Sequence, residues 1–466
     1  MIVIVLIFGL ILRLISINQS FWIDEATSAL TTKMNLADFF GKFMPGDFHP
    51  PLYYLTLRMW GGIFGTSEFA LRSLSVFFGI GTIYLVYLIG KKLAGKKVGI
   101  IASLVLATSG LHIYYSQEAR MYGMSTFLVT LSIFLFTRLI QGHGENSKTF
   151  HKGRVGDWVG FAIILGLIGL TDYLPLLIIP VFWIYGFFTK QKVDWWKKFV
   201  TSHIILLVLA LVWGPTFIKQ LTSGINVTST SPSWVAVLGT FSIKDILLIP
   251  VKFMIGRVGF DNKYIYTFIV AIVLAVFGFL IYKSKIYIKE QKLVYLWLLV
   301  PLGLAFIISI KLPVLNYFRF LFILPAFYLL IAFGVKTLNK KWQLVFLILV
   351  IAINLVTSFI YLTNIKFQRE DWRSAVSYIE HNKSSNSVVI FPADSQMEAY
   401  RYYDPKALIY GPSGIRTCYS EIWLIRYAQP ISDPNDITRF RVESLNYTKS
   451  SEYDFNGVTV WKYNSK

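Results

Sequence analysis

The sequence predicts a polytopic α-helical membrane protein of about eleven transmembrane helices, followed by a small extracytoplasmic α/β domain. Its 466 residues are 55% hydrophobic and only 15% charged, whereas a soluble domain averages about 25% charged residues. Apolar runs long enough to cross a bilayer recur as far as about residue 361. After Asn364 the composition changes to that of a soluble domain. The predicted boundaries are therefore 1–364 for the membrane domain and 365–466 for the second domain.

The net charge of +20 comes almost entirely from short loops in the membrane domain. Residues 365–466 hold 13 Lys and Arg against 12 Asp and Glu, so they add almost nothing to it. Lys and Arg collect in cytoplasmic loops of membrane proteins, whereas a nucleic-acid-binding protein carries its basic patch on a folded soluble face. We therefore expect no nucleic-acid partner. The predicted cytoplasmic loops are Lys91–Lys97, Arg138–Asp157, Lys190–Lys198, Lys283–Lys292 and Lys336–Lys341.

These loops divide the membrane domain into spans. Ile2 to Ile17 is expected to be an uncleaved first span, short for its role, with Arg13 reaching to the outer interface or the true start lying further upstream. The first outer loop, 18–68, follows it. Residues 98–138 are too long for one span and predict a hairpin, as do 158–188 and 293–335. Residues 199–282 hold two spans around an outer loop from about Lys219 to Lys263, and a last span runs over about 342–361. This topology places the N-terminus in the cytoplasm and the C-terminal domain outside the plasma membrane.

The C-terminal domain is predicted from its alternation of helical and strand-like patterns. A helical pattern begins near Glu370, and a second helix is expected over 396–403. Strands are expected at 387–391, 422–427 and 458–463. The single cysteine, Cys418, excludes an internal disulfide and is expected to be a small buried side chain.

The chemically capable residues fall at the outer ends of the predicted spans. They lie in Asp24-Glu25-Ala26, in His49-Pro50-Pro51-Leu52-Tyr53-Tyr54, in Tyr115-Ser116-Gln117-Glu118-Ala119-Arg120-Met121-Tyr122, at Asp172-Tyr173 and in Asn316-Tyr317-Phe318-Arg319. Each also has a structural interpretation. Asp24 and Glu25 fit a solvated helix start, His49 a loop hydrogen bond, and the arginines contacts with lipid headgroups. Their coincidence at one face of the membrane favours a functional site.

Together with Glu68-Phe69-Ala70-Leu71-Arg72-Ser73-Leu74-Ser75, these motifs resemble the protein-mannosyltransferase-like branch of the GT-C glycosyltransferases, a family 39-like group. This branch includes the dolichyl-phosphate-mannose protein mannosyltransferases and the bacterial aminoarabinose transferases of lipid A. The resemblance is strong over about residues 18–125 and weaker through Arg319 and Pro325. It implies a GT-C fold and the transfer of a monosaccharide from a polyprenyl-phosphate donor to a hydroxyl of a protein, lipid or surface glycan at the outer face.

The resemblance also implies roles for individual residues. Asp24 would be the base that activates the acceptor, and Glu25 would hold that base or the acceptor in place. The donor phosphate would be bound by Arg120, Tyr122, Arg319 and His49, although some relatives carry Lys-Pro where this chain has His49-Pro50. Substrate-positioning candidates are Glu118, Gln117, Asp172, Tyr53 and Tyr317. No cofactor is implied with certainty; a divalent cation would be sought at His49 and Glu25.

Chemistry agrees with these expectations. An outward-facing transferase has no nucleotide-sugar pool, so its donor must come through the membrane. A carboxylate can take the acceptor proton, and arginine can offset charge on a departing phosphate. One displacement would invert the anomeric centre. The alternatives are a lipid-sugar transporter or flippase, a membrane-anchored binding or assembly protein, and an oligosaccharide ligase of the same fold. Transporters place their sites near the bilayer midplane, which the motif positions do not favour.

Overall fold

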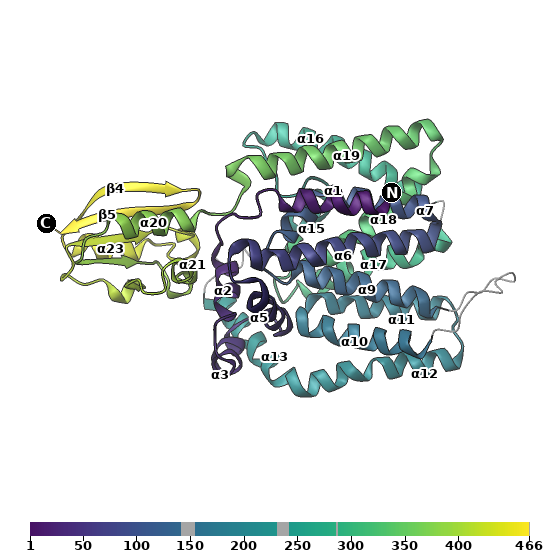
Figure 1. Ribbon diagram of the computed structural model, residues 1–466, viewed down its shortest axis with the longest axis horizontal. Coiled ribbons are helices and arrows are strands. Elements are labelled where there is room, and N and C mark those ends of the chain that lie inside the picture. Colours follow the sequence, from purple (N-terminus) through teal and green to yellow (C-terminus); the bar gives the residue numbers. More distant parts are fainter. Residues whose placement is uncertain (141–153, 231–241, 286–287, 466) are drawn as a thin grey trace.

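The computed structural model describes residues 1–140, 154–230, 242–285 and 288–465. It consists of an elongated helical bundle with a small α/β unit at one end (Figure 1). We call the end of the bundle that faces this unit the domain end and the opposite end the loop end. The predicted loops Arg138–Asp157, Lys219–Lys263 and Lys283–Lys292 fall partly outside the described residues.

The described helices match the predicted spans. Seven are long and apolar enough to cross a membrane: Glu68–Ala94, Tyr122–Leu139, Val193–Asn226, Lys263–Ser284, Gln291–Ile308, Tyr317–Thr337 and Lys340–Thr363. A bent pair, Lys96–Thr108 with Gly110–Ser116, passes the same test when taken as one span, and Ile2–Leu14, Val155–Thr171 and Leu174–Phe188 are shorter apolar helices. Among the described residues, seven or eight of the eleven predicted spans are thus long and apolar enough to cross a membrane, and the other three correspond to shorter apolar helices.

The bundle is built from helices that run between the two ends (Figure 1). Polar caps mark several starts: the Ser67 side chain accepts from Ala70 N, and the Asn339 side chain accepts from Trp342 N. The helical elements of the bundle are α1 (Ile2–Leu14), α6 (Glu68–Ala94), α7 (Lys96–Thr108), α8 (Gly110–Ser116), α9 (Tyr122–Leu139), α10 (Val155–Thr171), η2 (Leu174–Ile178), α11 (Ile179–Phe188), α12 (Val193–Ser202), α13 (Ile204–Thr230), α15 (Ile243–Ile255), α16 (Lys263–Ser284), α17 (Ile288–Ile308), η4 (Tyr317–Ile323), α18 (Leu324–Thr337) and α19 (Lys340–Thr363).

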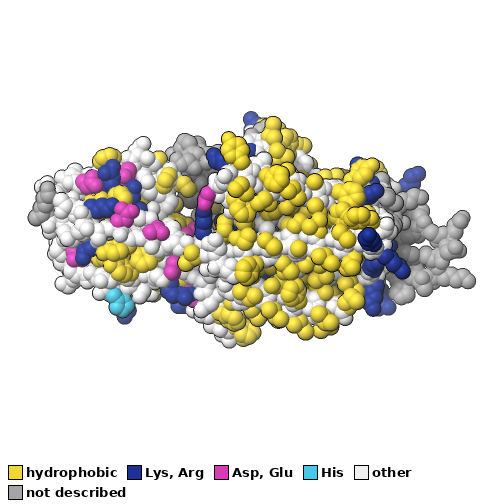
Figure 2. Space-filling view, turned by 90° about the horizontal axis from the view of Figure 1, so that it is seen from above, with side chains coloured by type: hydrophobic (Ala, Val, Ile, Leu, Met, Phe, Trp, Pro, Cys, Tyr) yellow, Lys and Arg dark blue, Asp and Glu magenta, His cyan; other side chains and the backbone are white. Residues whose placement is uncertain are grey.

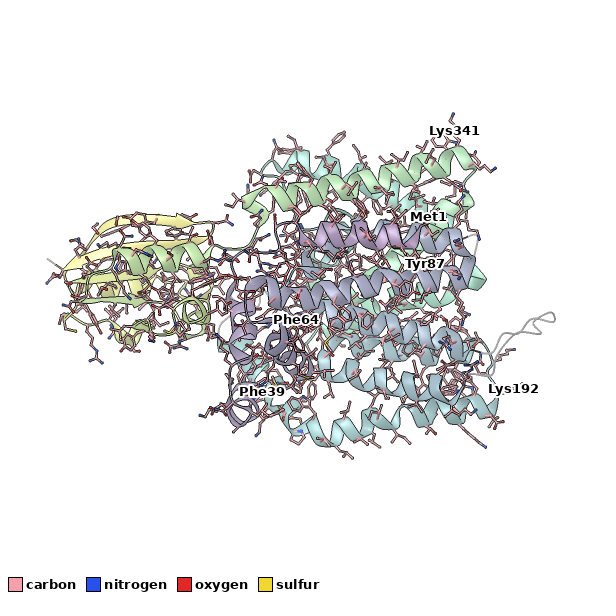
Figure 3. The ribbon with its side chains drawn as sticks, viewed as in Figure 1. Met1, Phe39, Phe64, Tyr87, Lys192 and Lys341 are labelled. Carbon is pink, nitrogen blue, oxygen red and sulfur yellow. The ribbon has the colours of Figure 1, made fainter. Side chains whose placement is uncertain are left out.

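The first outer loop folds into short helices at the domain end. They are α2 (Ile23–Thr31), α3 (Leu36–Asp38), η1 (Phe39–Phe43), α4 (Met44–Gly46) and α5 (Leu52–Phe64). Phe39 and Phe64 lie at this end, whereas Lys192 and Lys341 lie at the loop end (Figure 3). Hydrophobic side chains cover the middle of the face seen in Figure 2, and Lys and Arg gather at the loop end. This distribution is typical of a protein that crosses a bilayer.

Arg13 does not reach the outer interface as the sequence suggested. It is fully buried, and its guanidinium donates to Gly9 O at 2.8 Å, to Ala107 O at 3.0 Å and to Ser116 Oγ at 3.1 Å. It also contacts His112 Nδ1 at 2.5 Å. The bend of 65° between α7 and α8 frees carbonyl groups such as that of Ala107. Arg13 satisfies such a group, so the expectation of a surface role was wrong.

The C-terminal residues form a five-stranded mixed sheet in the order β2-β1-β3-β5-β4. Strands β1, β2 and β3 are parallel, and β5 is antiparallel to β3 and β4. The predicted strands at 387–391, 422–427 and 458–463 correspond to β1, β3 and β5, while β2, β4 and α23 were not predicted. The elements are η5 (Ile365–Phe367), α20 (Trp372–Asn382), β1 (Ser387–Ile390), η6 (Asp394–Gln396), α21 (Glu398–Tyr403), β2 (Ile409–Tyr410), η7 (Pro412–Gly414), β3 (Glu421–Ile425), α22 (Gln429–Ser432), α23 (Ile437–Ser444), β4 (Tyr447–Phe455) and β5 (Val458–Ser465).

Cys418 corrects a second expectation, because it is exposed rather than buried. It lies in the loop between η7 and β3, where the chain crosses the surface before it enters the sheet. The apolar interior of the sheet is instead formed by larger side chains such as Trp423 and Tyr463.

The C-terminal unit contacts the first outer loop directly. The hydroxyl of Tyr403 in α21 lies 2.8 Å from Glu68 Oε1 and accepts from Phe21 N at 2.8 Å. Tyr402 donates to Thr66 O at 2.8 Å, and Arg373 pairs with Glu68 at 2.6 Å. These contacts fix the unit over the domain end, where the candidate residues lie.

Candidate functional site

Asp24 and Arg120 meet at the domain end. Asp24 lies in the first turn of α2, and Arg120 lies in the loop Gln117–Met121 between α8 and α9. Arg120 NH2 is 3.6 Å from Asp24 Oδ2. The Asp24 side chain is 43% exposed, whereas that of Arg120 is 6% exposed. The carboxylate is therefore open to a solvent-borne acceptor, while the cation lies behind it in the protein.

Arg120 belongs to a larger polar group. Its NH1 donates to Tyr54 Oη at 3.4 Å, and Tyr54 donates to Asp47 Oδ2 at 2.7 Å. His49 Nδ1 lies 3.7 Å from Asp47 Oδ1. Burial alone would raise the pKa of Asp47, but the neighbouring His49, the charge of Arg120 and the hydrogen bond from Tyr54 lower it to about 2.

One N–H group of the Arg120 guanidinium is not used as a hydrogen-bond donor within the described part of the protein. Its Nε is buried and has no hydrogen-bond acceptor among the described residues. A buried N–H without an acceptor is costly in a folded protein. An anion bound beside Arg120 would supply that acceptor, as the phosphate-binding role requires.

A second cation, Arg319, lies on η4, which packs against α9. It is half-buried and forms no ion pair with any of the described side chains. The ring of its neighbour Phe318 stands edge-on to Tyr122, with centroids 5.4 Å apart, and Tyr115 is 5.2 Å from Tyr122. Arg319 therefore offers an unpaired charge beside an aromatic wall.

Asp172 lies within the electrostatic reach of both His49 and Arg319. Burial raises the pKa of Asp172 above its ordinary value, and the charges of His49 and Arg319 oppose that shift. Its neighbour Tyr173 donates to Gln220 Oε1 at 2.5 Å, and Gln220 Nε2 donates to His49 O at 3.2 Å. The loop after α10 is thus linked to the loop that carries His49.

Glu25 lies next to Asp24 in sequence but in a different environment. It is fully buried and accepts from Arg72 Nε at 2.8 Å and Arg72 NH2 at 2.5 Å. Its Oε1 also accepts from Ala119 N at 2.8 Å. Burial would raise the pKa of Glu25, but the charges of Arg369 and Arg72 outweigh burial and lower it. Glu25 thus holds the loop Gln117–Met121 from within the protein.

Several other predicted residues are also held inside the protein. Gln117 donates to Arg13 O and Ile15 O and accepts from Tyr361 Oη at 2.9 Å. Glu118 is 1% exposed and pairs with Arg369 NH2 at 3.2 Å. Tyr53 is 1% exposed. Tyr317, by contrast, is half-buried, and Lys252 Nζ lies 6.0 Å from the centre of its ring.

Arg257 is a functional candidate that the sequence analysis missed. It lies in the loop after α15, is exposed, and has its guanidinium 4.4 Å from the centre of the Tyr114 ring. Gly256 makes this turn with a φ of +65°, and a Cβ there would lie 3.2 Å from Leu111 N. In the sequence, Gly256-Arg257 lies within a predicted outer loop. Nothing in the neighbouring residues indicated that this loop contacts α8.

Glu25, one of the two positions considered for a divalent cation, is already fully engaged within the protein. The described part of the chain contains no group of three or more His, Cys, Asp and Glu side chains that could hold a metal ion. Both oxygens of Glu25 are already engaged by Arg72.

Comparisons with known proteins agree with the resemblance seen in the sequence. The family described as dolichyl-phosphate-mannose-protein mannosyltransferase matches residues 48–216. An uncharacterised protein of Aquifex aeolicus (strain VF5) is 28% identical over 123 residues, which are 26% of this chain and 24% of that relative.

Similar solved structures cover nearly the whole chain. ArnT from Cupriavidus metallidurans in the apo state has a TM-score of 0.59 at 11% identity and covers 98% of this chain and 97% of its own. The same protein bound to undecaprenyl phosphate gives 0.55, also at 11% identity, with 98% and 96% covered. The archaeal oligosaccharyltransferase AglB from Archaeoglobus fulgidus, in complex with an inhibitory peptide and a dolichol-phosphate, gives 0.56 at 12% identity, with 99% and 73% covered.

The chain is thus a polytopic membrane protein with the fold of the GT-C glycosyltransferases and a small C-terminal sheet, and it resembles the protein-mannosyltransferase-like group in its motifs.

Proposed function

We propose that this protein transfers a monosaccharide from a polyprenyl-phosphate donor to an acceptor hydroxyl at the domain end of the bundle. The observation that carries the proposal is the pairing of the half-exposed Asp24 with the buried Arg120 at 3.6 Å. A base open to solvent and a buried cation beside it are the two groups that such a transfer needs. The similar structures that contain undecaprenyl phosphate or dolichol-phosphate support a polyprenyl-linked donor.

The reaction would proceed in one displacement. Asp24 takes the proton of the acceptor hydroxyl, whose oxygen attacks the anomeric carbon of the donor sugar. The bond from that carbon to the phosphate oxygen breaks, and the phosphate leaves with its electron pair on the polyprenyl carrier. Attack from the face opposite the phosphate inverts the anomeric configuration.

The cations stabilise the leaving phosphate. The free Nε of Arg120 donates to a phosphate oxygen, and Arg319 adds a second positive charge. The Tyr122 hydroxyl and His49 complete this side of the site. Asp172 and Tyr317 are proposed to position the sugar. Arg257 adds positive charge beside Tyr114.

The sidedness follows from the charged loops. The loop end carries Lys192 and Lys341, so we propose that it faces the cytoplasm. The N-terminus is then cytoplasmic, and Asp24 and residues 365–466 lie outside the plasma membrane. We keep 1–364 as the catalytic membrane domain and 365–466 as the extracytoplasmic domain.

An oligosaccharide ligase is the second candidate, because the chain also shares its fold with AglB. The match of residues 48–216 to the mannosyltransferase family favours a monosaccharide donor instead.

The test is transfer by the purified full chain in liposomes. Polyprenyl-monophosphate sugars, labelled in the sugar, are supplied with membrane and surface-glycan fractions as acceptors, and labelled products are identified by mass spectrometry. We expect label in a new glycosidic bond. Movement of the lipid across the bilayer without a new bond would indicate a transporter. Consumption of pyrophosphate-linked oligosaccharide alone would indicate a ligase.

A further inference from the structure

Arg369 is a cation from outside the predicted membrane domain that enters the candidate site. It lies in the extended segment between η5 and α20, and its side chain is 2% exposed. Its Nε is 3.4 Å from Glu25 Oε2, and its NH2 is 3.2 Å from Glu118 Oε2. NH2 also donates to Gln117 O at 3.3 Å, and NH1 donates to Tyr114 Oη at 2.8 Å. One guanidinium therefore joins α2, α8 and the loop that carries Arg120.

The backbone of Arg369 is fixed by both parts of the molecule. Its N–H donates to Gln19 Oε1 in the first outer loop at 3.0 Å. Its carbonyl accepts from Asn456 Nδ2, in the turn between β4 and β5, at 2.9 Å. The position of the guanidinium consequently depends on how the C-terminal sheet is seated on the membrane domain.

Arg369 belongs to a cluster of four buried charged side chains. Glu25 and Glu118 contribute two negative charges, and Arg72 and Arg369 two positive charges, and all four side chains are almost fully buried. Among the described side chains, Arg369 is the cation that forms an ion pair with Glu118. Loss of Arg369 would leave one buried carboxylate without its ion-pair partner, which is unfavourable in a low-dielectric interior.

Two members of this cluster also hold the loop Gln117–Met121 in place. That loop is held by Glu25 at Ala119 N, by Ser75 at Glu118 O and by Arg369 at Gln117 O. Arg120 follows Ala119 within this loop, and in the proposed reaction its Nε must point toward the donor phosphate. A shift of even about 1 Å in such a group weakens binding and turnover strongly.

We propose that Arg369 is a positioning residue through which the seated C-terminal domain fixes the loop Gln117–Met121 and so aims Arg120 at the donor phosphate. The inference rests on the proposed polyprenyl-phosphate donor. It assigns the C-terminal domain a part in donor binding, in addition to any contact with the acceptor.

The test compares Arg369→Gln with Arg373→Gln. Arg369 lies just before α20 and Arg373 in its first turn. Arg373→Gln removes one contact that seats the C-terminal unit, the pair with Glu68, while the contacts of Tyr402 and Tyr403 keep the unit in place, and Arg373 has no hydrogen bond or ion pair with the described loop Gln117–Met121. Undecaprenyl phosphate is titrated into each purified full-length variant in detergent, and binding is followed by tryptophan fluorescence. We expect the dissociation constant to rise about tenfold or more for Arg369→Gln and to stay within about twofold for Arg373→Gln.

Two further variants separate positioning from folding. Arg369→Lys keeps the charge but not the forked geometry, so it should recover part of the lost affinity. The double variant Arg369→Gln with Glu118→Gln keeps the cluster neutral, so its thermal unfolding should return toward that of the wild type while donor binding stays weak.

The inference would be overturned by any of three results: unchanged binding in Arg369→Gln, an equal loss in Arg373→Gln, or full recovery of binding in the double variant. If the wild type itself bound no undecaprenyl phosphate and transferred no sugar from any polyprenyl-phosphate donor, the proposed function would fail, and the inference with it.

Discussion

Asp24 Oδ2 and Arg120 NH2 lie 3.6 Å apart, although one residue follows the first span and the other lies at the tip of a later hairpin. Arg120 is almost fully buried and Asp24 is not. In the proposed reaction, Asp24 would face the acceptor and Arg120 would face the phosphate of the donor.

Replacing Asp24 with Asn should lower kcat by about 100-fold or more, because general-base catalysis typically contributes that factor. Donor binding and stability should remain near wild type, since Asp24 is 43% exposed. The measurement is sugar transfer in liposomes alongside undecaprenyl phosphate titration. Asp38→Asn is the matched control, an exposed carboxylate of the same outer loop paired with Lys42. Normal turnover of Asp24→Asn would remove Asp24 as the base.

Replacing Arg319 with Gln should raise the donor KM about tenfold, because an unpaired cation beside a phosphate contributes a charge-assisted hydrogen bond. The stability of the Arg319→Gln variant should be close to that of the wild type, since none of the described side chains forms an ion pair with Arg319. Lys311→Gln is the control, because Lys311 is an exposed cation between α17 and η4. A KM equal to that of the control would exclude Arg319 from the phosphate site.

Replacing Glu25 with Gln should destabilise the protein by about 3–5 kcal/mol, because Arg72 and Arg369 would lose a fully buried partner. Thermal unfolding in detergent is the measurement, with Asp24→Asn as the comparison. Adjacent carboxylates should thus give opposite phenotypes: loss of stability at Glu25 and loss of turnover at Asp24. Equal stability of both variants would contradict the structural role of Glu25.

The stabilisation contributed by Asp47 should depend on pH. Its pKa in the folded protein, about 2, lies below the ordinary value of 3.8. A lowered carboxyl pKa contributes stability above the ordinary value and loses it as the pH falls through the folded value. The shift corresponds to about 2 kcal/mol. Wild type and Asp47→Asn should differ more in thermal unfolding at pH 6 than at pH 3, and an equal difference at both pH values would contradict the assigned environment of Asp47.

The sequence predicted the membrane class, the spans and the end of the bundle at which the polar motifs gather. Those features depend on local composition, because a helix needs about twenty apolar residues to cross a bilayer and loops show their charges directly. The contiguous motif from Tyr115 to Tyr122 and the pair Asp24-Glu25 supplied most residues of the candidate site for the same reason.

The division of roles within the site came from the tertiary structure. Asp24 and Glu25 are neighbours in sequence, but one faces solvent and the other is enclosed by Arg72 and Arg369. Arg257 and Arg369 looked like ordinary loop and soluble-domain residues, and Arg13 looked like an interfacial one. Burial and ion pairing bring together side chains that are distant in the sequence, and such pairings cannot be predicted from the spacing of neighbouring residues. Composition therefore determined that this is a multi-pass membrane protein, while long-range packing decided which charged side chains are already paired and which are not.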